Sequence, residues 1–147
     1  MAVSAKLYGN ALVSFFDKKI DFNSDTIKLA LCTSSYTPDQ DAHDYFNDIT
    51  NEVSDSGTGY TAGGNTISSC TITYTAGTNV LKLDGEDVTF TAVTLTARYG
   101  IIYDSTPGSA ATNPLIAYID FGEDVSPSAG NLLITFHTDG ICTFTVA

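Results

Sequence analysis

The sequence predicts a mainly β protein: an antiparallel β-sandwich or barrel of about seven to eight strands with one N-terminal α-helix. The first observation is compositional, because 21 threonines recur beside Ile, Val, Tyr and Phe, which strands favour. The second is a succession of short alternating apolar and polar runs from residue 26 onward, with turn-forming clusters at 105–109 and 126–130. Since no internal repeat or linker interrupts them, the 147 residues are expected to form a single domain.

Residues 4–17 are the one segment with helical periodicity. Their apolar side chains are spaced so that they share one face of a helix of about three to four turns. This face consists of Leu7, Tyr8, Ala11, Leu12, Phe15 and Phe16. We expect Ser4 to cap the start of the helix, and Lys18 and Lys19 to favour the negative end of its dipole. The apolar face is also a candidate contact with a neighbouring subunit.

The other regular segments are expected to be strands. They are residues 26–33, 66–75, 80–83, 88–93, 95–103, 115–121, 132–138 and 141–146. Between the last two, Asp139-Gly140 is a strong signal for a two-residue hairpin. In such a hairpin His137 lies directly opposite Cys142, with about 4.5–5.5 Å between their Cβ atoms.

A Cys beside a His is the starting point for a thiol nucleophile, but a third residue must orient the imidazole. Asp139 lies in the turn itself and cannot take that position. The pair His137 and Cys142 is therefore interpreted as a by-product of the hairpin, and no catalytic residue is assigned.

The acidic segment 39–52 is a candidate for calcium, because clustered carboxylates bind that ion. The calcium-loop pattern fails at two positions, with Asp44 in place of the required Gly and Thr50 in place of the bidentate Glu. His43 is the one nitrogen ligand there, too few for zinc. We interpret the segment as a solvated acidic loop and expect no bound metal.

The glycine-rich segment 57–64 lacks the features of a phosphate-binding loop. A strand pattern follows it instead of a helix, and the nearest downstream lysine is Lys82. Its glycines are explained by tight turns that need positive φ. We therefore expect no cofactor and no enzyme activity.

Residues 34–64 form a long stretch without a good strand pattern, which is uncommon in compact domains and is often functional. Four aromatic residues recur in it: Tyr36, Tyr45, Phe46 and Tyr60. They either hold the loop against the core or anchor an interface with another protein. Contact between the loop and the core is slightly favoured, and the four aromatic residues remain our candidate interface residues.

The charge balance limits the partners. Six Lys and Arg against 17 Asp and Glu give a formal charge of −11, which repels nucleic acid and anionic lipid. No apolar run approaches the roughly 20 residues of a membrane helix, and the N-terminus does not resemble a signal peptide. We expect neither nucleic acid nor membrane as a partner.

The three cysteines, Cys32, Cys70 and Cys142, lie far apart and form no CxxC pair. An odd number in a chain without a recognised signal indicates free thiols in a reducing cytoplasm. The alternative is a disulfide between subunits through one or more of them, formed after release from the cell.

Several segments resemble small virion structural proteins of tailed bacteriophages. The similarity is strongest at Gly57-Thr-Gly-Tyr-Thr-Ala-Gly-Gly64 and extends over nearly the whole chain. The other matching segments are 6–8, 25–39, 42–49, 51–54, 97–104, 115–122 and 139–141.

This resemblance implies a non-enzymatic virion protein, assembled in the bacterial cytoplasm. A capsid decoration, or cement, protein is expected first: it would bridge and stabilise subunits of the major capsid protein, as a trimer or dimer. A neck, tail, baseplate or tail-fibre adaptor protein is the alternative within the same class. A receptor- or carbohydrate-binding β-domain is a further alternative.

Overall fold

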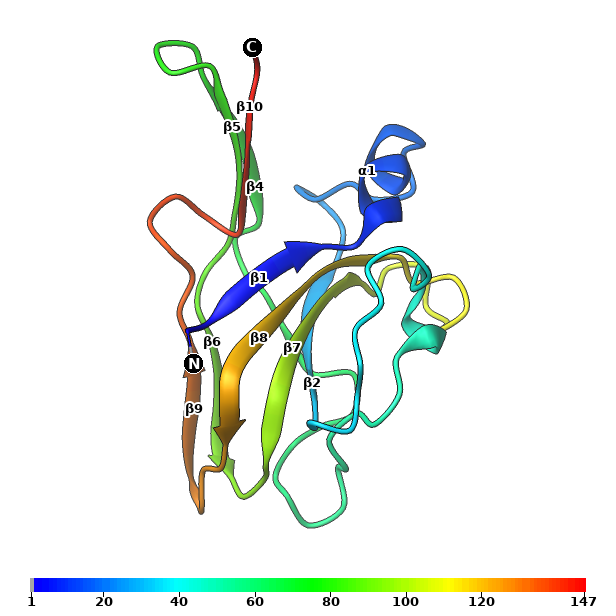
Figure 1. Ribbon diagram of the computed structural model, residues 1–147, viewed down its shortest axis with the longest axis vertical. Coiled ribbons are helices and arrows are strands. Elements are labelled where there is room, and N and C mark those ends of the chain that lie inside the picture. Colours follow the sequence, from blue (N-terminus) through cyan, green and yellow to red (C-terminus); the bar gives the residue numbers. More distant parts are fainter. Residues whose placement is uncertain (1) are drawn as a thin grey trace.

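The computed structural model describes residues 2–147 and has ten strands, one α-helix and one 3₁₀ turn (Figure 1). The strands are β1 (Ser4–Leu7), β2 (Ile27–Cys32), β3 (Asn65–Thr66), β4 (Thr71–Thr75), β5 (Val80–Asp84), β6 (Val88–Val93), β7 (Ala97–Asp104), β8 (Leu115–Val125), β9 (Gly130–Ile134) and β10 (Cys142–Thr145). The helix is α1 (Gly9–Phe16), and the 3₁₀ turn is η1 (Phe46–Asp48). The mainly β, antiparallel class is confirmed, with more strands than the sequence indicated.

The strands form three antiparallel sheets. A five-stranded sheet has the order β1-β8-β7-β2-β3, a two-stranded sheet pairs β6 with β9, and a three-stranded sheet has the order β10-β5-β4. Across residues 2–147 the sheets do not close into a barrel, so the architecture is sandwich-like. The three-stranded sheet, which we call the arm, projects beyond the body beside α1 (Figure 1).

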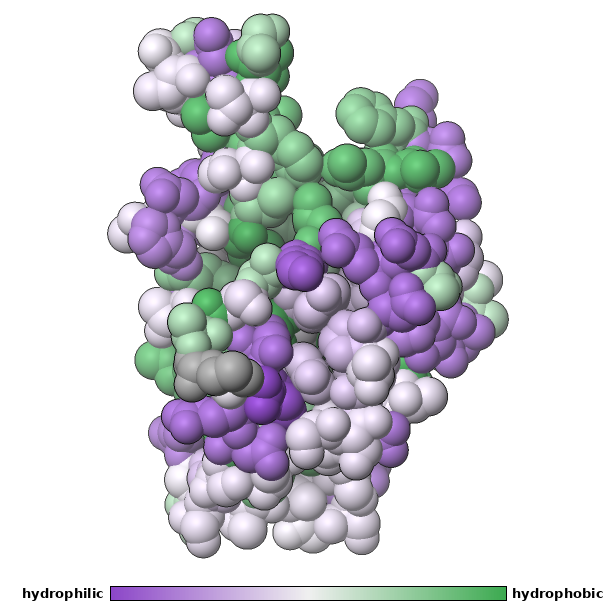
Figure 2. All heavy atoms as spheres, viewed as in Figure 1, coloured by the Kyte–Doolittle hydropathy of each residue, from purple (hydrophilic) through white to green (hydrophobic). Residues whose placement is uncertain are grey.

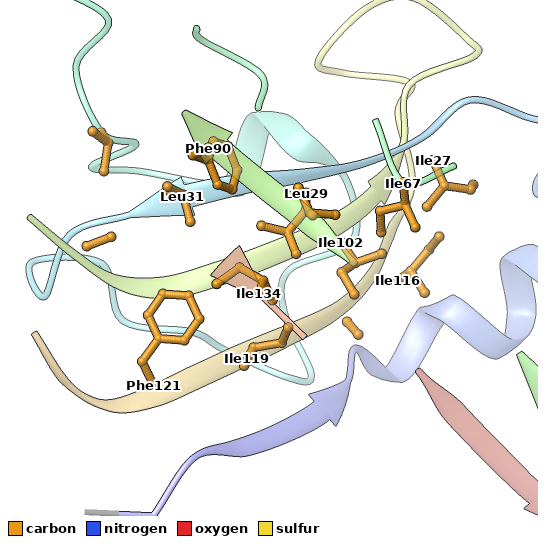
Figure 3. Packing of buried hydrophobic residues seen from close by; sticks show 14 of the residues in the cluster. Ile27, Leu29, Leu31, Ile67, Phe90, Ile102, Ile116, Ile119, Phe121 and Ile134 are labelled. Carbon is orange, nitrogen blue, oxygen red and sulfur yellow. The ribbon is translucent and has the colours of Figure 1, made fainter. Parts of the chain in front are cut away.

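The larger part of the core lies on one face of the five-stranded sheet. Leu29 of β2 and Ile102 of β7 pack there with Phe90 of β6 and Ile134 of β9 (Figure 3). These side chains come from both the five-stranded and the two-stranded sheet, as expected for a sandwich. Burial of this apolar surface is the main force that holds the two sheets together.

A second cluster covers the opposite face of the same sheet. It contains Ala30 and Cys32 of β2, Ile101 and Tyr103 of β7, and Tyr36 from the long loop. Side chains on both faces of β2 are thus buried. Tyr36, Phe46 and Ile49 of the segment 34–64 thus cover this face of the sheet, whereas Val53 and Tyr60 of the same segment pack in the first cluster. These contacts order a long loop that has no strands of its own.

The N-terminal helix is shorter than its periodicity predicts. Residues Ser4–Leu7 form β1, which pairs with β8 in the register Ser4↔Asp120 to Leu7↔Ala117. Tyr8 is the N-cap residue of α1, and Ser4 caps nothing. The prediction was wrong at this end because pairing with the edge of the sheet satisfies the backbone of residues 4–7 as well as a helix would.

The predicted hairpin at Asp139-Gly140 is also wrong in its strand pairing. β9 pairs with β6, and β10 pairs with β5. His137 faces Gly140 in an isolated bridge rather than Cys142, and its Nδ1 lies 3.2 Å from Asp139 Oδ2 at the surface. The turn forms, but each flanking strand finds its partner in another part of the chain.

The predicted strand at 66–75 is two strands. β3 pairs with β2, whereas β4 pairs with β5 in the arm. Between them Ser69 has a φ of +53°, a left-handed conformation that interrupts extended chain. This break lets the polypeptide leave the body of the protein and enter the arm.

Candidate functional site

Tyr36, one of the four aromatic interface candidates, is buried with 1% of its surface exposed. Its hydroxyl lies 2.9 Å from the Tyr8 hydroxyl and 2.8 Å from Nδ1 of His43. Burial raises the pKa of Tyr36 to about 12, so the hydroxyl stays protonated at neutral pH. Tyr36 therefore holds the loop to the core, which corrects its assignment to an interface.

Tyr60 is buried in the same way, with 3% of its surface exposed. Its hydroxyl donates to Glu52 Oε1 at 2.7 Å and accepts a hydrogen bond from the backbone N–H of Leu31 at 3.1 Å. Burial and the nearby Glu52 carboxylate both raise the pKa of Tyr60. Tyr60 thus bonds to the backbone of β2, and it too is a core residue rather than an interface residue.

Tyr45 and Phe46 are half-buried, and Phe46 packs against the second cluster. The ring of Phe46 stacks on Tyr103 with 4.1 Å between ring centroids. The Tyr45 hydroxyl accepts a hydrogen bond from Lys19 Nζ at 3.3 Å. Both side chains have contacts that fix the loop, and their role in an interface stays a prediction.

The glycine-rich segment and the acidic segment have structural explanations. Gly59 and Gly64 have φ angles of +75° and +74°, and a Cβ atom on Gly64 would collide with the carbonyl oxygen of Leu29. Asp39 Oδ1 accepts hydrogen bonds from the backbone N–H groups of Asp41 and Ala42, which closes a local turn. Among residues 2–147 no group of three or more His, Cys, Asp or Glu side chains is arranged to hold a metal ion.

The cysteines are all free thiols. Cys32 is completely buried, and burial raises its pKa to about 12, so it cannot reach another subunit while the protein is folded. This corrects its assignment as an intersubunit cysteine. Cys70 and Cys142 are half-buried, and burial raises both pKa values, that of Cys70 to about 11. For these two a disulfide between subunits stays a prediction.

The alternation of residues in the arm gives it one apolar face. In the ladder, Ile72 lies opposite Leu83, and Tyr74 lies opposite Leu81. On the other side of β5, Phe144 of β10 lies opposite Leu81. Side chains of residues that lie opposite each other on neighbouring strands share a face of the sheet, so these apolar residues form one surface. The threonines that alternate with them on β4 and β10 point to the opposite face of the arm.

This apolar face forms one wall of an open groove of about 650 Å³, and α1 forms the other. Figure 2 shows hydrophobic residues gathered in the notch between the arm and the helix. Among the apolar lining residues, the most exposed are Phe16 at 85% and Val146 at 53%. Lys18 and Asp21 are the charged residues that contribute to the lining, one of each sign.

The groove was only partly detectable from the sequence. The apolar face of residues 4–17 was predicted as a candidate contact with a neighbouring subunit, and its Leu12 and Phe16 line the groove. The contact itself stays a prediction. The opposite wall was missed, although the alternation of Thr71, Thr73 and Thr75 with Ile72 and Tyr74 predicted a strand. Alternation identifies an apolar face but does not say whether another element covers it.

Within residues 2–147, no helix has the length and hydropathy needed to cross a bilayer. No family model matches the chain, and neither a curated protein nor a solved structure matches it. The resemblance to small phage virion proteins therefore stays a prediction from the sequence, to be weighed together with the groove.

Proposed function

We propose that this protein is a structural subunit of a tailed-bacteriophage virion, and specifically a decoration protein on the outer surface of the capsid. The virion class comes from the resemblance of segments such as 57–64 and 97–104 to small virion structural proteins. The position on the outer surface is inferred from charge, because a chain of net charge −11 is repelled by the DNA packaged inside.

The observation that carries the proposal is the open apolar groove between α1 and the arm. Among its lining residues, Phe16 of α1 and Val146 beside the arm expose 85% and 53% of their surfaces. A contiguous exposed apolar surface rimmed by polar residues is typical of a protein–protein interaction site. The groove thus supports a subunit that functions in contact with other proteins.

A decoration protein stabilises a shell by binding only its assembled form. Each bound copy adds its binding free energy to the assembled state, and the free subunits gain nothing. Apolar and aromatic side chains are suited to this role, because their burial supplies affinity without a need for charge. The partners in this proposal are the major capsid protein and neighbouring copies of the chain.

The experiment is a count of copies per purified virion by quantitative mass spectrometry, with the major capsid protein as the internal reference. A decoration protein is expected in a simple ratio to the capsid protein, such as one to one or one trimer per local threefold axis. In a second experiment, capsids that lack the protein are incubated with purified protein, and bound protein is measured after sedimentation.

A few copies per virion, or a few dozen, would overturn the decoration role in favour of a neck, tail, baseplate or tail-fibre adaptor. Absence from virions would overturn the virion assignment itself. In that case the receptor- or carbohydrate-binding alternative would be tested by measuring the affinity of the isolated protein for glycans.

A further inference from the structure

We infer that the groove between α1 and the arm is filled by the arm of a second copy of this chain, each copy inserting its arm into the groove of the other. The inference deepens the proposed function, because it rests on the assembly role of this same groove and names the neighbour that occupies it. It follows from the edges, the charge and the apolar area of the arm.

The arm has a strand edge without the usual protection. β10 is the outer strand of its sheet, and no strand of the described chain pairs with its second edge. Its residues Cys142–Thr145 contain no charged residue and no proline, the features with which proteins normally block such edges. An unprotected edge beside an exposed apolar face is stable when another protein covers it.

Charge favours a second copy as that protein. The strands of the arm and the turn at 76–79 contain two charged residues, Lys82 and Asp84, whose Nζ and Oδ2 atoms are 2.9 Å apart. All other acidic residues of this strongly acidic chain lie outside these segments. The arm is therefore a neutral part of the molecule, where two copies can approach with little electrostatic repulsion.

The exposed apolar area is sufficient for such a contact. The exposed parts of Leu12, Phe16, Ile72, Tyr74 and Val146 amount to roughly 500 Å² per copy, given the size of these side chains. Two copies would bury roughly 1,000 Å² through these residues alone, near the lower limit for specific interfaces. The arm backbone and its remaining side chains add to this area.

The shape of the molecule fits a reciprocal contact. The arm projects beyond the body and forms one side of the notch (Figures 1 and 2). If the arm of a second copy enters this notch, its apolar face lies against the apolar face of the first arm. The arrangement has twofold symmetry and closes on itself, because the same surface is used by both copies. It also covers Phe16 and Leu12 of α1 with part of the partner.

A small apolar ligand is a poorer fit to the groove. Sites for small molecules combine apolar walls with a few convergent polar groups that orient the ligand. Here Lys18 and Asp21 supply the charged groups of the lining, and the other lining residues are hydrophobic. A second protein surface, in contrast, needs only a complementary apolar face.

The test is sedimentation velocity of the full chain over a wide range of concentrations, with three variants. Tyr74→Asp places a charge on the exposed face of the arm, and Phe16→Ser removes the exposed aromatic ring of α1. Leu133→Asp is the matched control, because Leu133 is 56% exposed, close to the 54% of Tyr74, but lies on β9 and not on the arm or α1. Circular dichroism verifies the fold of each variant.

We expect the wild type and Leu133→Asp to form dimers with the same dissociation constant. For Tyr74→Asp and Phe16→Ser we expect that constant to rise at least tenfold. Hydrogen exchange of the amides of residues 142–145 is expected to be slower in the dimer than in the monomer. If Tyr74→Asp fails to fold, Phe16→Ser carries the test alone, since its side chain is at the surface.

A wild type that stays monomeric at every concentration would overturn the inference, and so would a trimer or groove variants that match the control. The outcome is separate from that of the proposed function. A monomer that still coats virions in many copies refutes this inference alone. A dimer that is absent from virions refutes the virion role alone.

Discussion

The hydroxyl groups of Tyr8 and Tyr36 lie 2.9 Å apart in the core, where they join the start of α1 to the long loop. The Tyr36 hydroxyl is also 2.8 Å from Nδ1 of His43, which lies on the same loop. In a low-dielectric interior each of these polar groups depends on the others for its hydrogen bonds. The segment that covers the sheet is therefore held by a buried polar network as well as by apolar contacts.

Replacement of Tyr36 by Phe is expected to lower the free energy of unfolding by about 1–3 kcal/mol, because it leaves the buried Tyr8 hydroxyl without its partner and removes one of the two hydrogen bonds of His43 Nδ1. Urea denaturation monitored by fluorescence measures the change. The control is Tyr74→Phe, which removes an exposed hydroxyl that bonds to Asn79 at 3.0 Å and is expected to cost less than about 0.5 kcal/mol. Equal losses in the two variants would contradict a structural role for the network.

Gly64 is expected to tolerate no side chain. Its φ of +74° is strained for alanine, and the new Cβ would collide with the carbonyl of Leu29 in β2. Gly64→Ala should lower stability by more than about 3 kcal/mol, because β3 would have to separate from β2. Gly77→Ala is the matched control: its Cβ would meet no atom within 4 Å, and its thermal midpoint should match the wild type. Thermal denaturation of both variants tests the difference.

Asp104 predicts a pH dependence of stability. Its carboxyl is completely buried, its Oδ2 atom has no hydrogen-bond partner, and burial raises its pKa from 3.8 to about 6, with a further contribution from Asp25. The folded state thus binds this proton more tightly than the unfolded state. The resulting stabilisation is complete below about pH 4 and is lost as the pH rises through 6, for a total of about 3 kcal/mol.

Asp104→Asn tests this prediction. The amide oxygen can still accept the hydrogen bond from the Thr106 backbone N–H, which is 2.8 Å from Oδ1 in the wild type, and the side chain no longer carries a charge. We expect the variant to be more stable than the wild type at pH 8 and to lack the decline between about pH 4 and pH 7. A decline of the same size in both proteins would assign the pH dependence to other groups. Asp139→Asn, at an exposed position, is the control.

The three cysteines should differ in reactivity toward iodoacetamide. Cys32 should react only after unfolding, because it is completely buried and its pKa is raised to about 12. Cys70 and Cys142 should react slowly at neutral pH, since both are half-buried with raised pKa values and the thiolate is the reactive form. Mass spectrometry of timed samples gives the order. Rapid labelling of Cys32 in the folded protein would show that the second cluster opens readily.

The sequence predicted local structure well where burial of apolar residues alone determined the conformation of a segment. Residues 88–93 form β6 with the predicted bounds, and Val88, Phe90 and Val93 are buried in the core. The prediction failed where distant segments compete for the same backbone. Residues 4–7 have helical spacing but pair with β8, and the strands on either side of Asp139-Gly140 pair with β6 and β5. No local pattern specifies those choices of partner.

The candidate site shows the same limit. The aromatic residues of the long loop are equally compatible with burial and exposure until the fold is known, and Tyr36 and Tyr60 proved to be buried. In the arm, Ile72 and Tyr74 look like ordinary inward-facing strand residues, yet they remain exposed because no other layer of residues 2–147 covers that face. Exposure of an apolar face is a property of the whole fold and is visible only there.

The arm joins segments that lie far apart in the sequence. Its central strand β5 ends at Asp84, whereas β10 begins at Cys142, after the whole of β6 to β9 has been made. The wall of the groove is therefore built from segments that lie far apart in the sequence, and it is complete only when Phe144 pairs with Leu81. Loss of β10 alone would leave β4 and β5 paired but would remove Phe144 from this wall.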